Sequence, residues 1–331
     1  TFVVRLRAED GLYGEGEAAP AYWIGEGSLA ATEAALHRIA ARAGDRMDAD
    51  DLRAWWASER NLDPAAACAL DAALVDLAAR RAGVPACAVL AAKEAAPPTD
   101  VLPVAALLGG SDAAALATAV DAALADGFET LKLKVGDGPL ADDLARVDMV
   151  RQRAGRTIAL RLDANRAWTA DEAERALAAF APAMPAFVEE PLLDSDPRTL
   201  AALARTTGVA IAVDESIATA ADLERLLDAD ARAHVVLKAG RVGGPSRLVA
   251  LARRARAAGL PVVVTDGIES AVGTGVAVHA AAAAGVDLAV GLGGIQLVAA
   301  LAAFRGPEVR PSPPGFAIAV DRGARRAASH G

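Results

Sequence analysis

Short apolar runs recur through residues 102–294, and the segments between them have the apolar spacing of helices. The runs begin about every 25 residues and are LPVAALLG (102–109), TLKLKVG (130–136), TIALRLDAN (157–165), AFVEEPL (186–192), VAIAVDES (209–216), HVVLKAG (234–240), PVVVTDG (261–267) and DLAVGLGG (287–294). Apolar strands alternating with helices are typical of a parallel sheet covered by helices. We expect an α/β protein, and eight such units predict a (β/α)₈ barrel. A doubly wound sheet, the alternative, would usually need fewer units and a glycine-rich phosphate turn, which the first run lacks.

The first hundred residues follow a different pattern. TFVVRLRAEDGLYGEGEAAP (1–20) alternates apolar and polar residues around EDG, which predicts an antiparallel hairpin. Helical patterns follow over 28–44, 48–58 and 63–83. In the last of them Asp63 suits the N-cap and Gly83 suits the C-terminal stop. Strands followed by helices indicate an α+β unit.

These patterns divide the chain into three parts. We expect an α+β domain over residues 1–100, with its boundary at AAPP (95–98), and the barrel over residues 101–305. Residues 306–331 form a C-terminal segment with one more strand in PSPPGFAIAVDRGA (311–324). That strand is expected to return to the N-terminal hairpin, so that both ends of the chain build the α+β domain.

Composition narrows the partners and the location. The net charge of −9 and the isoelectric point near 5.1 argue against nucleic acid and anionic membranes, which require a basic face. Cys68 and Cys87 are too few for a disulfide scaffold or a zinc cluster and favour buried thiols of a cytosolic protein. No apolar run reaches membrane-spanning length without a charge, and the strand-like opening is unlike a signal peptide. We therefore expect a cytoplasmic protein.

Three successive predicted strands end in acids. The third strand ends in Asp163, the fourth in Glu189 and Glu190, and the fifth in Asp214 and Glu215. In a barrel these ends share the side on which catalytic groups lie. A single acid there could be an N-cap, but crowded acids repel one another unless a cation lies between them. Carboxylates without cysteine or histidine suit Mg²⁺ rather than Zn²⁺, with Mn²⁺ as a substitute.

Lysines follow a second pattern at the strand ends. Lys132 and Lys134 are two residues apart, so their side chains point to the same side of a strand. If that side is the barrel interior, each lowers the pKa of the other and one can act as a base; a solvated pair is the alternative. Across the barrel, the sixth predicted strand ends in Lys238. A metal between lysines suggests that the metal holds a substrate carboxylate while a lysine removes the α-proton.

The motifs LKLKVG, RLDANRAW, FVEEP, AVDES, VVLKAG and TDGIES together resemble the enolase superfamily, in which lysine and Mg²⁺ act together in this way. The resemblance is to its muconate-lactonizing-enzyme subgroup and covers nearly the whole chain. GEGEAAP is similar to the end of the hairpin in that family's capping domain, which implies a barrel with an α+β capping domain built from the N-terminal region and the C-terminal tail.

The resemblance also implies site residues. The Mg²⁺ ligands would be Asp163, Glu189 and Asp214, and Lys134 and Lys238 would take the catalytic positions. The groups expected to orient these side chains or the substrate are Lys132, Arg161, Asn165, Glu215, Asp266, Glu269 and Gly293. Tyr22 and Trp23 could close over the substrate as a lid or pack between the domains.

Within the subgroup, RLDANRAW, GEGEAAP and GLGG most resemble o-succinylbenzoate synthase. This implies a Mg²⁺-dependent lyase of menaquinone biosynthesis that dehydrates a cyclohexadiene carboxylate. Lys134 would abstract the α-proton, the metal would hold the enediolate, and Lys238 would stabilise the anion while hydroxide leaves from the same face. Asp266 stands where such synthases often have serine.

Other activities stay open because the subgroup shares these lysines and acids. N-succinylamino-acid racemase and muconate cycloisomerase fit the same residues, whereas a dipeptide epimerase would normally show an Asp-x-Asp pair where this chain has DLAVGLGG. A barrel that binds a ligand without catalysis is a further alternative. The expected partner is a small anionic carboxylate, with neither nucleic acid nor membrane, in a protein that could form a homo-oligomer.

Overall fold

The computed structural model describes residues 1–21, 27–44, 48–58, 62–92, 97–110, 112–293 and 306–321. The N-terminal region (residues 1–92) consists of the hairpin β1 (Phe2–Arg7) and β2 (Tyr13–Ala18) and the helices α1 (Leu29–Ala43), α2 (Ala49–Ser58), α3 (Pro64–Ala82) and α4 (Ala86–Leu90). The predicted hairpin and the three longer helices are confirmed. Asp63 caps α3 by accepting the Ala66 N–H, and Gly83 ends it in the left-handed conformation. The predicted boundary at residues 95–98 lies partly outside the described residues.

Close packing between β2 and α3 explains the glycines of GEGEAAP. A Cβ on Gly14 would lie 2.2 Å from the carbonyl oxygen of Ala73, and one on Gly16 would lie 2.0 Å from that of Ala69. Heavy atoms cannot approach so closely, so only glycine lets β2 lie directly on the helix backbone. The alanine-rich α3 is buried along nearly its whole length, because small side chains let its neighbours approach on several sides.

Eight parallel strands form the second part of the molecule, and each lies inside one of the eight predicted runs. They are β3 (Leu102–Leu108), β4 (Thr130–Lys134), β5 (Ala159–Asp163), β6 (Phe187–Glu189), β7 (Ile211–Val213), β8 (His234–Leu237), β9 (Val262–Val264) and β10 (Val290–Gly291). They pair in chain order from β3 to β9, and β10 pairs with β3. Between β9 and β10 the ladder narrows to one bridge, Thr265 to Gly291, beside the Asp266 N–H that donates to the Gly291 carbonyl at 2.8 Å. The predicted barrel is confirmed.

Helices connect these strands. They are α5 (Ala113–Ala125), α6 (Leu140–Ala154), α7 (Ala170–Phe180), α8 (Pro197–Thr207), α9 (Ala220–Asp228), α10 (Ala239–Val242), α11 (Pro245–Ala257) and α12 (Ala271–Ala284). Several begin at a side-chain cap: Asp112 and Asp196 accept an N–H of the first turn, and Thr169 forms a capping box with Glu172. Local sequence therefore sets where the helices begin, while the apolar strands form the centre of the barrel.

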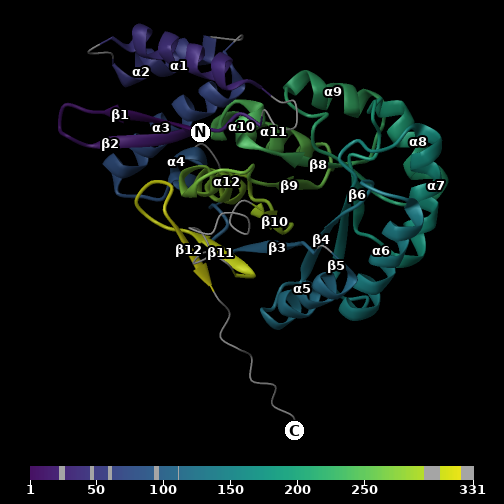
Figure 1. Ribbon diagram of the computed structural model, residues 1–331. Helices are drawn as coiled ribbons and strands as arrows, with labels where there is room; N and C mark the ends of the chain where they lie inside the picture. Colours follow the sequence, from purple (N-terminus) through teal and green to yellow (C-terminus); the bar gives the residue numbers. More distant parts are fainter. Residues whose placement is uncertain are drawn as a thin grey trace.

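Figure 1 shows how the two parts are arranged. The hairpin with α1 and α2 lies at one side of the molecule, and α5 to α9 line the opposite side of the barrel. Helices α10, α11 and α12 lie between the N-terminal region and the barrel strands, and α3 contacts both α10 and α11. The loops that follow β8 and β9 therefore rest against the N-terminal region.

The C-terminal tail corrects one prediction. Its strands are β11 (Glu308–Pro311) and β12 (Ile318–Asp321), which pair with each other. β11 also pairs with the start of β3, while β1 and β2 remain a sheet of their own, so the expected return to the hairpin is wrong for the pairing. The reason is that β3 pairs with β4 only from Ala106 onward, which leaves the edge at Leu102 free. The tail still contacts α3, where Asp76 accepts the Phe316 N–H at 3.2 Å.

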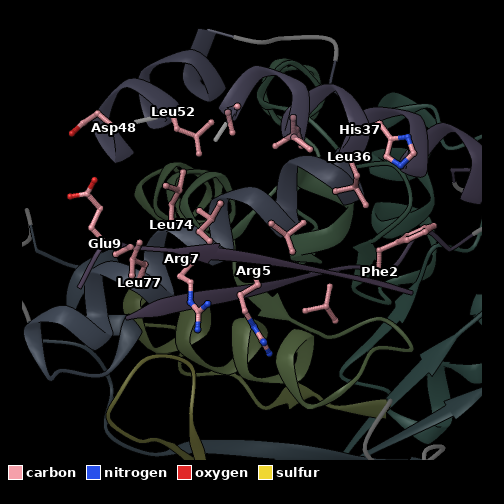
Figure 2. A pocket seen from close by; sticks show the side chains of 18 of the residues that line it. Phe2, Arg5, Arg7, Glu9, Leu36, His37, Asp48, Leu52, Leu74 and Leu77 are labelled. Atoms are coloured by element: carbon pink, nitrogen blue, oxygen red, sulfur yellow. The ribbon is translucent and has the colours of Figure 1, made fainter. Parts of the chain in front are cut away.

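A groove of about 1250 Å³ lies between the hairpin and helices α1, α2 and α3 (Figure 2). Leu36, Leu52, Leu74 and Leu77 are among the side chains that line it. The residues along this groove include none of the strand-end acids or lysines singled out in the sequence, so it is separate from the predicted site. Within the described ranges, no helix combines the length and apolar character needed to cross a membrane.

Candidate active site

Three carboxylates meet at the carboxyl ends of neighbouring strands. Asp163 is the last residue of β5, Glu189 is the last of β6, and Asp214 directly follows β7. Asp163 lies opposite Glu189 in the strand register. Their exposed fractions are only 2%, 2% and 1%, respectively. We call these three side chains the carboxylate cluster; such deep burial of acids requires partners of opposite charge.

Lys132 of β4 lies between two members of the carboxylate cluster. Its Nζ is 2.9 Å from Asp163 Oδ2 and 2.8 Å from Glu189 Oε2. Burial alone would lower the pKa of this ammonium, but the carboxylates outweigh burial and raise the pKa of Lys132 above its usual value. The prediction that the two lysines of β4 lower each other's pKa is therefore wrong for Lys132, because opposite charges dominate its surroundings.

Two cations hold the third carboxylate. Lys238 Nζ lies 2.5 Å from Asp214 Oδ2, and Arg241 donates to Asp214 Oδ1. Burial raises the pKa of Asp214, but the positive charges of Lys238 and Arg241 lower it by more than burial raises it. The pKa of Asp214 therefore lies below its usual value. Arg241 was missed in the sequence. The available signal was a basic residue three positions after Lys238, just beyond the end of a barrel strand.

Glu189 is the least satisfied member of the carboxylate cluster. Its Oε1 is buried and has no hydrogen-bond partner. Burial, followed by the nearby Asp163 carboxylate, raises the pKa of Glu189 to about 7, although Lys132 opposes the shift. An orphaned buried oxygen costs free energy unless a ligand satisfies it.

These residues fit a hard divalent cation. Mg²⁺ prefers oxygen ligands, and the carboxylate cluster supplies carboxylates from three adjacent strands together with the orphaned Glu189 Oε1. Among the described residues, no three acidic, histidine or cysteine side chains already have their donor atoms gathered around one metal position. The carboxylates instead face ammonium and guanidinium groups, so a bound cation would have to share or replace these contacts.

Lys134 differs from Lys132 in exposure and partners. Its side chain is 49% exposed, its Nζ is 3.7 Å from Asp163 Oδ2, and it donates to Asn165 Oδ1. Asn165 has a positive φ of 43° and donates through Nδ2 to Glu215 Oε1 at 3.1 Å. The amide therefore joins the β4 lysine to an acid of the loop after β7, and Lys134 is the β4 lysine that is open to a ligand.

Lys134 and Lys238 stand on opposite walls. β4 and β8 are separated by three strands in either direction around the barrel. Lys238 is the more enclosed of the two, with 22% of its side chain exposed. A molecule held between the walls would present one face to each lysine, which is an arrangement suited to proton transfer at a single carbon.

Arg161 is a buried cation of β5 that precedes the carboxylate cluster along the strand. It lies two residues before Asp163 on β5, is 4% exposed, and donates from Nη1 to the Ala289 carbonyl at 2.8 Å. Its guanidinium lies 5.2 Å from the centre of the Phe187 ring, in a cation–π contact. Burial lowers the pKa of Arg161 to about 10, with Glu189 opposing the shift. The structure thus places a buried positive charge under the carboxylate cluster.

The remaining predicted residues occupy other positions. The Asp266 carboxylate accepts a hydrogen bond from Thr274 Oγ1 at 3.3 Å, so it contacts helix α12. Glu269 lies beside the glycines at 240, 267 and 273, and burial raises its pKa to about 7, with the nearby Glu17 carboxylate adding to the shift. Gly293 packs near Leu107. Tyr22 and Trp23 lie outside the described residues, so the lid prediction is untested.

Fold and site together define an α/β-barrel enzyme with lysines and carboxylates at the carboxyl ends of its strands. A family model described as "Enolase C-terminal domain-like" matches residues 114–322. The chain belongs to this family, that is, to the enolase superfamily, and its relatives place it in the muconate-lactonizing-enzyme subgroup.

Relatives of several activities match the chain. A hydrophobic dipeptide epimerase from Enterococcus faecalis is 29% identical over 85% of this chain and 78% of its own length. An o-succinylbenzoate synthase from Thermobifida fusca is 38% identical, but over 54% of this chain and 53% of its own length. The solved structure of the L-Ala-D/L-Glu epimerase from Bacillus subtilis superposes with a TM-score of 0.86 at 26% identity and covers 96% of this chain and 90% of its own. The comparisons therefore fix the superfamily, while the relatives carry out different reactions.

Proposed function

We propose that this enzyme removes the α-proton of a small anionic carboxylate in a Mg²⁺-dependent reaction, and that its reaction is the dehydration of a cyclohexadiene carboxylate to o-succinylbenzoate. The observation that carries the proposal is the pair of lysines, Lys134 and Lys238, on opposite walls beside three buried carboxylates. Other divalent ions of similar preference, such as Mn²⁺, should substitute.

The residues of the chain would divide the work. Asp163, Glu189 and Asp214 would hold Mg²⁺, which when bound supplies positive charge to a substrate carboxylate. Lys134, in its deprotonated form, accepts the α-proton at Nζ, and the Asn165 amide keeps that nitrogen in place. Lys238 contributes positive charge from the other wall. The proton and the hydroxide lost from the neighbouring carbon together make one water.

Two features favour dehydration over epimerisation of dipeptides. The described residues at the carboxyl end of β10, Gly291 to Gly293, include no acid that could pair with a dipeptide ammonium. Asp287 is exposed and precedes β10, at the opposite end of the strand from the site. The similarity to an o-succinylbenzoate synthase at 38% identity, although it covers half of each chain, points in the same direction.

The second candidate is a racemase or epimerase. A 1,1-proton transfer needs a lysine on each face of the reacting carbon, and this chain has both. The similarity to dipeptide epimerases extends over 85% of the chain, further than that to the synthase. Racemisation of N-succinyl amino acids and muconate cycloisomerisation belong to the same candidate, since both depend on the same side chains.

A substrate panel tests the proposal. The purified protein with Mg²⁺ should turn over the cyclohexadiene precursor faster than N-succinyl amino acids, dipeptides or muconate. Loss of the diene absorbance measures turnover of the precursor. Turnover of dipeptides without the precursor would replace the lyase by the epimerase. If Mg²⁺ binds and no member of the panel reacts, the non-catalytic binding barrel becomes the better account.

A further inference from the structure

Glu190, the second acid of FVEEP, makes more polar contacts than any member of the carboxylate cluster. Its side chain is fully buried. Its Oε2 accepts the Asp214 N–H at 2.6 Å and the Ser216 N–H at 3.3 Å. Its Oε1 accepts the hydroxyl groups of Ser195 and Ser216. Glu190 therefore binds the backbone on both sides of Glu215, and one of the two N–H groups belongs to Asp214, a predicted metal ligand.

The backbone of Glu190 reaches the other neighbouring strands. Its N–H donates to the Ala212 carbonyl of β7 at 2.8 Å, and its carbonyl accepts the Arg166 N–H at 2.7 Å, just beyond β5. Glu190 has a positive φ of 41°, an uncommon conformation for a residue that is not glycine. The residue thus connects the ends of β5, β6 and β7, and these strands carry Asp163, Glu189 and Asp214.

We propose that Glu190 is a positioning residue that sets the spacing of the carboxylate cluster without binding the metal itself. The inference rests on the proposed function. Three acids at one rim repel one another, so their backbone needs a fixed frame before a cation arrives. A carboxylate saturated by two N–H and two O–H donors supplies such a frame and has little remaining capacity to act as a ligand.

Two substitutions separate hydrogen bonding from charge. In Glu190→Gln the amide oxygen can still accept the Asp214 and Ser216 N–H groups, and its NH₂ can donate to the serine hydroxyls, which can also accept. Glu190→Ala removes all of these contacts. We expect Glu190→Ala to weaken Mg²⁺ binding by about 10- to 100-fold, and Glu190→Gln to stay within about threefold of the unchanged protein.

Asp76 provides a matched control. It is 1% exposed, accepts two backbone N–H groups, from Glu15 at 2.9 Å and from Phe316 at 3.2 Å, and pairs with Arg80. Asp76→Ala should therefore lower the melting temperature about as much as Glu190→Ala. It should leave Mg²⁺ affinity within about threefold, because Asp76 lies in the N-terminal region.

Calorimetric titration with Mg²⁺, alongside thermal melting of each variant, gives the result. Normal binding by Glu190→Ala, or equal weakening in Asp76→Ala, would overturn the inference. Equal loss in Glu190→Gln and Glu190→Ala would also overturn it, because that pattern indicates a metal ligand. If Glu190→Ala does not fold, the double variant Ser195→Ala and Ser216→Ala replaces it, with at least about threefold weaker binding expected and unchanged binding as the contrary outcome. Absence of Mg²⁺ binding in the unchanged protein would overturn the proposed function as well.

Discussion

Two buried carboxylates of the N-terminal region, Glu17 and Asp71, differ in their partners from the carboxylate cluster of the barrel. In the N-terminal region, Glu17 of β2 accepts the N–H groups of Ser270 and Gly273, each at 3.0 Å, at the start of α12. Asp71 of α3 accepts both the N–H and the hydroxyl of Ser246, each at 2.8 Å, at the start of α11. Neutral donors of the barrel therefore satisfy these two acids, which act as helix caps supplied by a distant segment.

The carboxylate cluster has charged partners instead. Lys132 bridges Asp163 and Glu189, Lys238 contacts Asp214, and Glu189 Oε1 has no hydrogen-bond partner. Backbone donors are part of a helix and cannot be exchanged without unfolding it. An ammonium group on a flexible side chain can move aside for another cation. The comparison indicates that the first kind of carboxylate holds the two parts together, whereas the second kind is prepared for a ligand.

Asp163→Asn should give the largest effect. The change is nearly isosteric and relieves repulsion, so the fold should survive. Mg²⁺ binding should weaken, and kcat/KM for the reacting member of the panel should fall roughly a thousandfold or more, because stabilisation of the developing negative charge is lost. Asp76→Asn is the control from the N-terminal region and should lower stability without this loss. An Asp163→Asn protein that binds Mg²⁺ normally and turns over substrate would remove the metal-site assignment.

Lys134→Ala tests the base without touching the carboxylates. Exchange of the substrate α-proton with deuterated solvent, followed by NMR, should slow by about 10²- to 10⁴-fold. Mg²⁺ affinity should remain within about threefold, since Nζ of Lys134 is 3.7 Å from the nearest cluster oxygen and Lys132 is closer. Persistent exchange in Lys134→Ala would transfer the role of base to Lys238.

Glu17→Ala tests the other kind of carboxylate. It should destabilise the protein by about 1–3 kcal/mol, because the first N–H groups of α12 lose their buried acceptor. Urea unfolding measures the loss. Mg²⁺ affinity should not change. A variant that keeps its full stability, or that loses Mg²⁺ binding, would contradict the division between structural and functional acids.

Asp71→Asn should produce the smallest effect, visible as a change in pH dependence. Burial raises the pKa of Asp71 to about 6, with Ser246, Arg247 and Arg53 opposing the shift. An acid whose folded pKa lies above its unfolded value contributes stability at low pH and loses it as the pH rises through the folded pKa. The unchanged protein, saturated with Mg²⁺, should therefore lose about 1 kcal/mol between about pH 5 and pH 7 through this group.

Asp71→Asn should reduce that slope. Denaturant unfolding at several pH values measures the free energy of unfolding of both proteins. The contributions of other titrating acids cancel in the difference between the two slopes. Equal slopes would show that Asp71 keeps an ordinary pKa in the folded protein.

Much of the site was readable because its residues follow local rules. Acids at the ends of apolar runs and lysines two residues apart were visible in the sequence, since parallel strands bring their carboxyl ends to one side. Three of the four lysines in the chain lie in this site, whereas 30 of the 34 lysine and arginine residues are arginines. Arginine cannot release its proton near neutral pH, so a chain that otherwise uses arginine has a chemical reason to keep lysine here.

By itself the sequence determined the strands, the helix starts and the rim on which the acids gather, because periodicity and caps depend on neighbours along the chain. Only the tertiary structure decided the raised pKa of Lys132, the pairing of the tail with β3, and the contact of Glu17 with α12. Glu17 and Ser270 are 253 positions apart, and no local sequence pattern around either residue predicts that they are in contact. Such contacts depend on how closely packed elements approach one another in space. The close packing of Gly16 against α3 is one example, and the whole fold sets that distance.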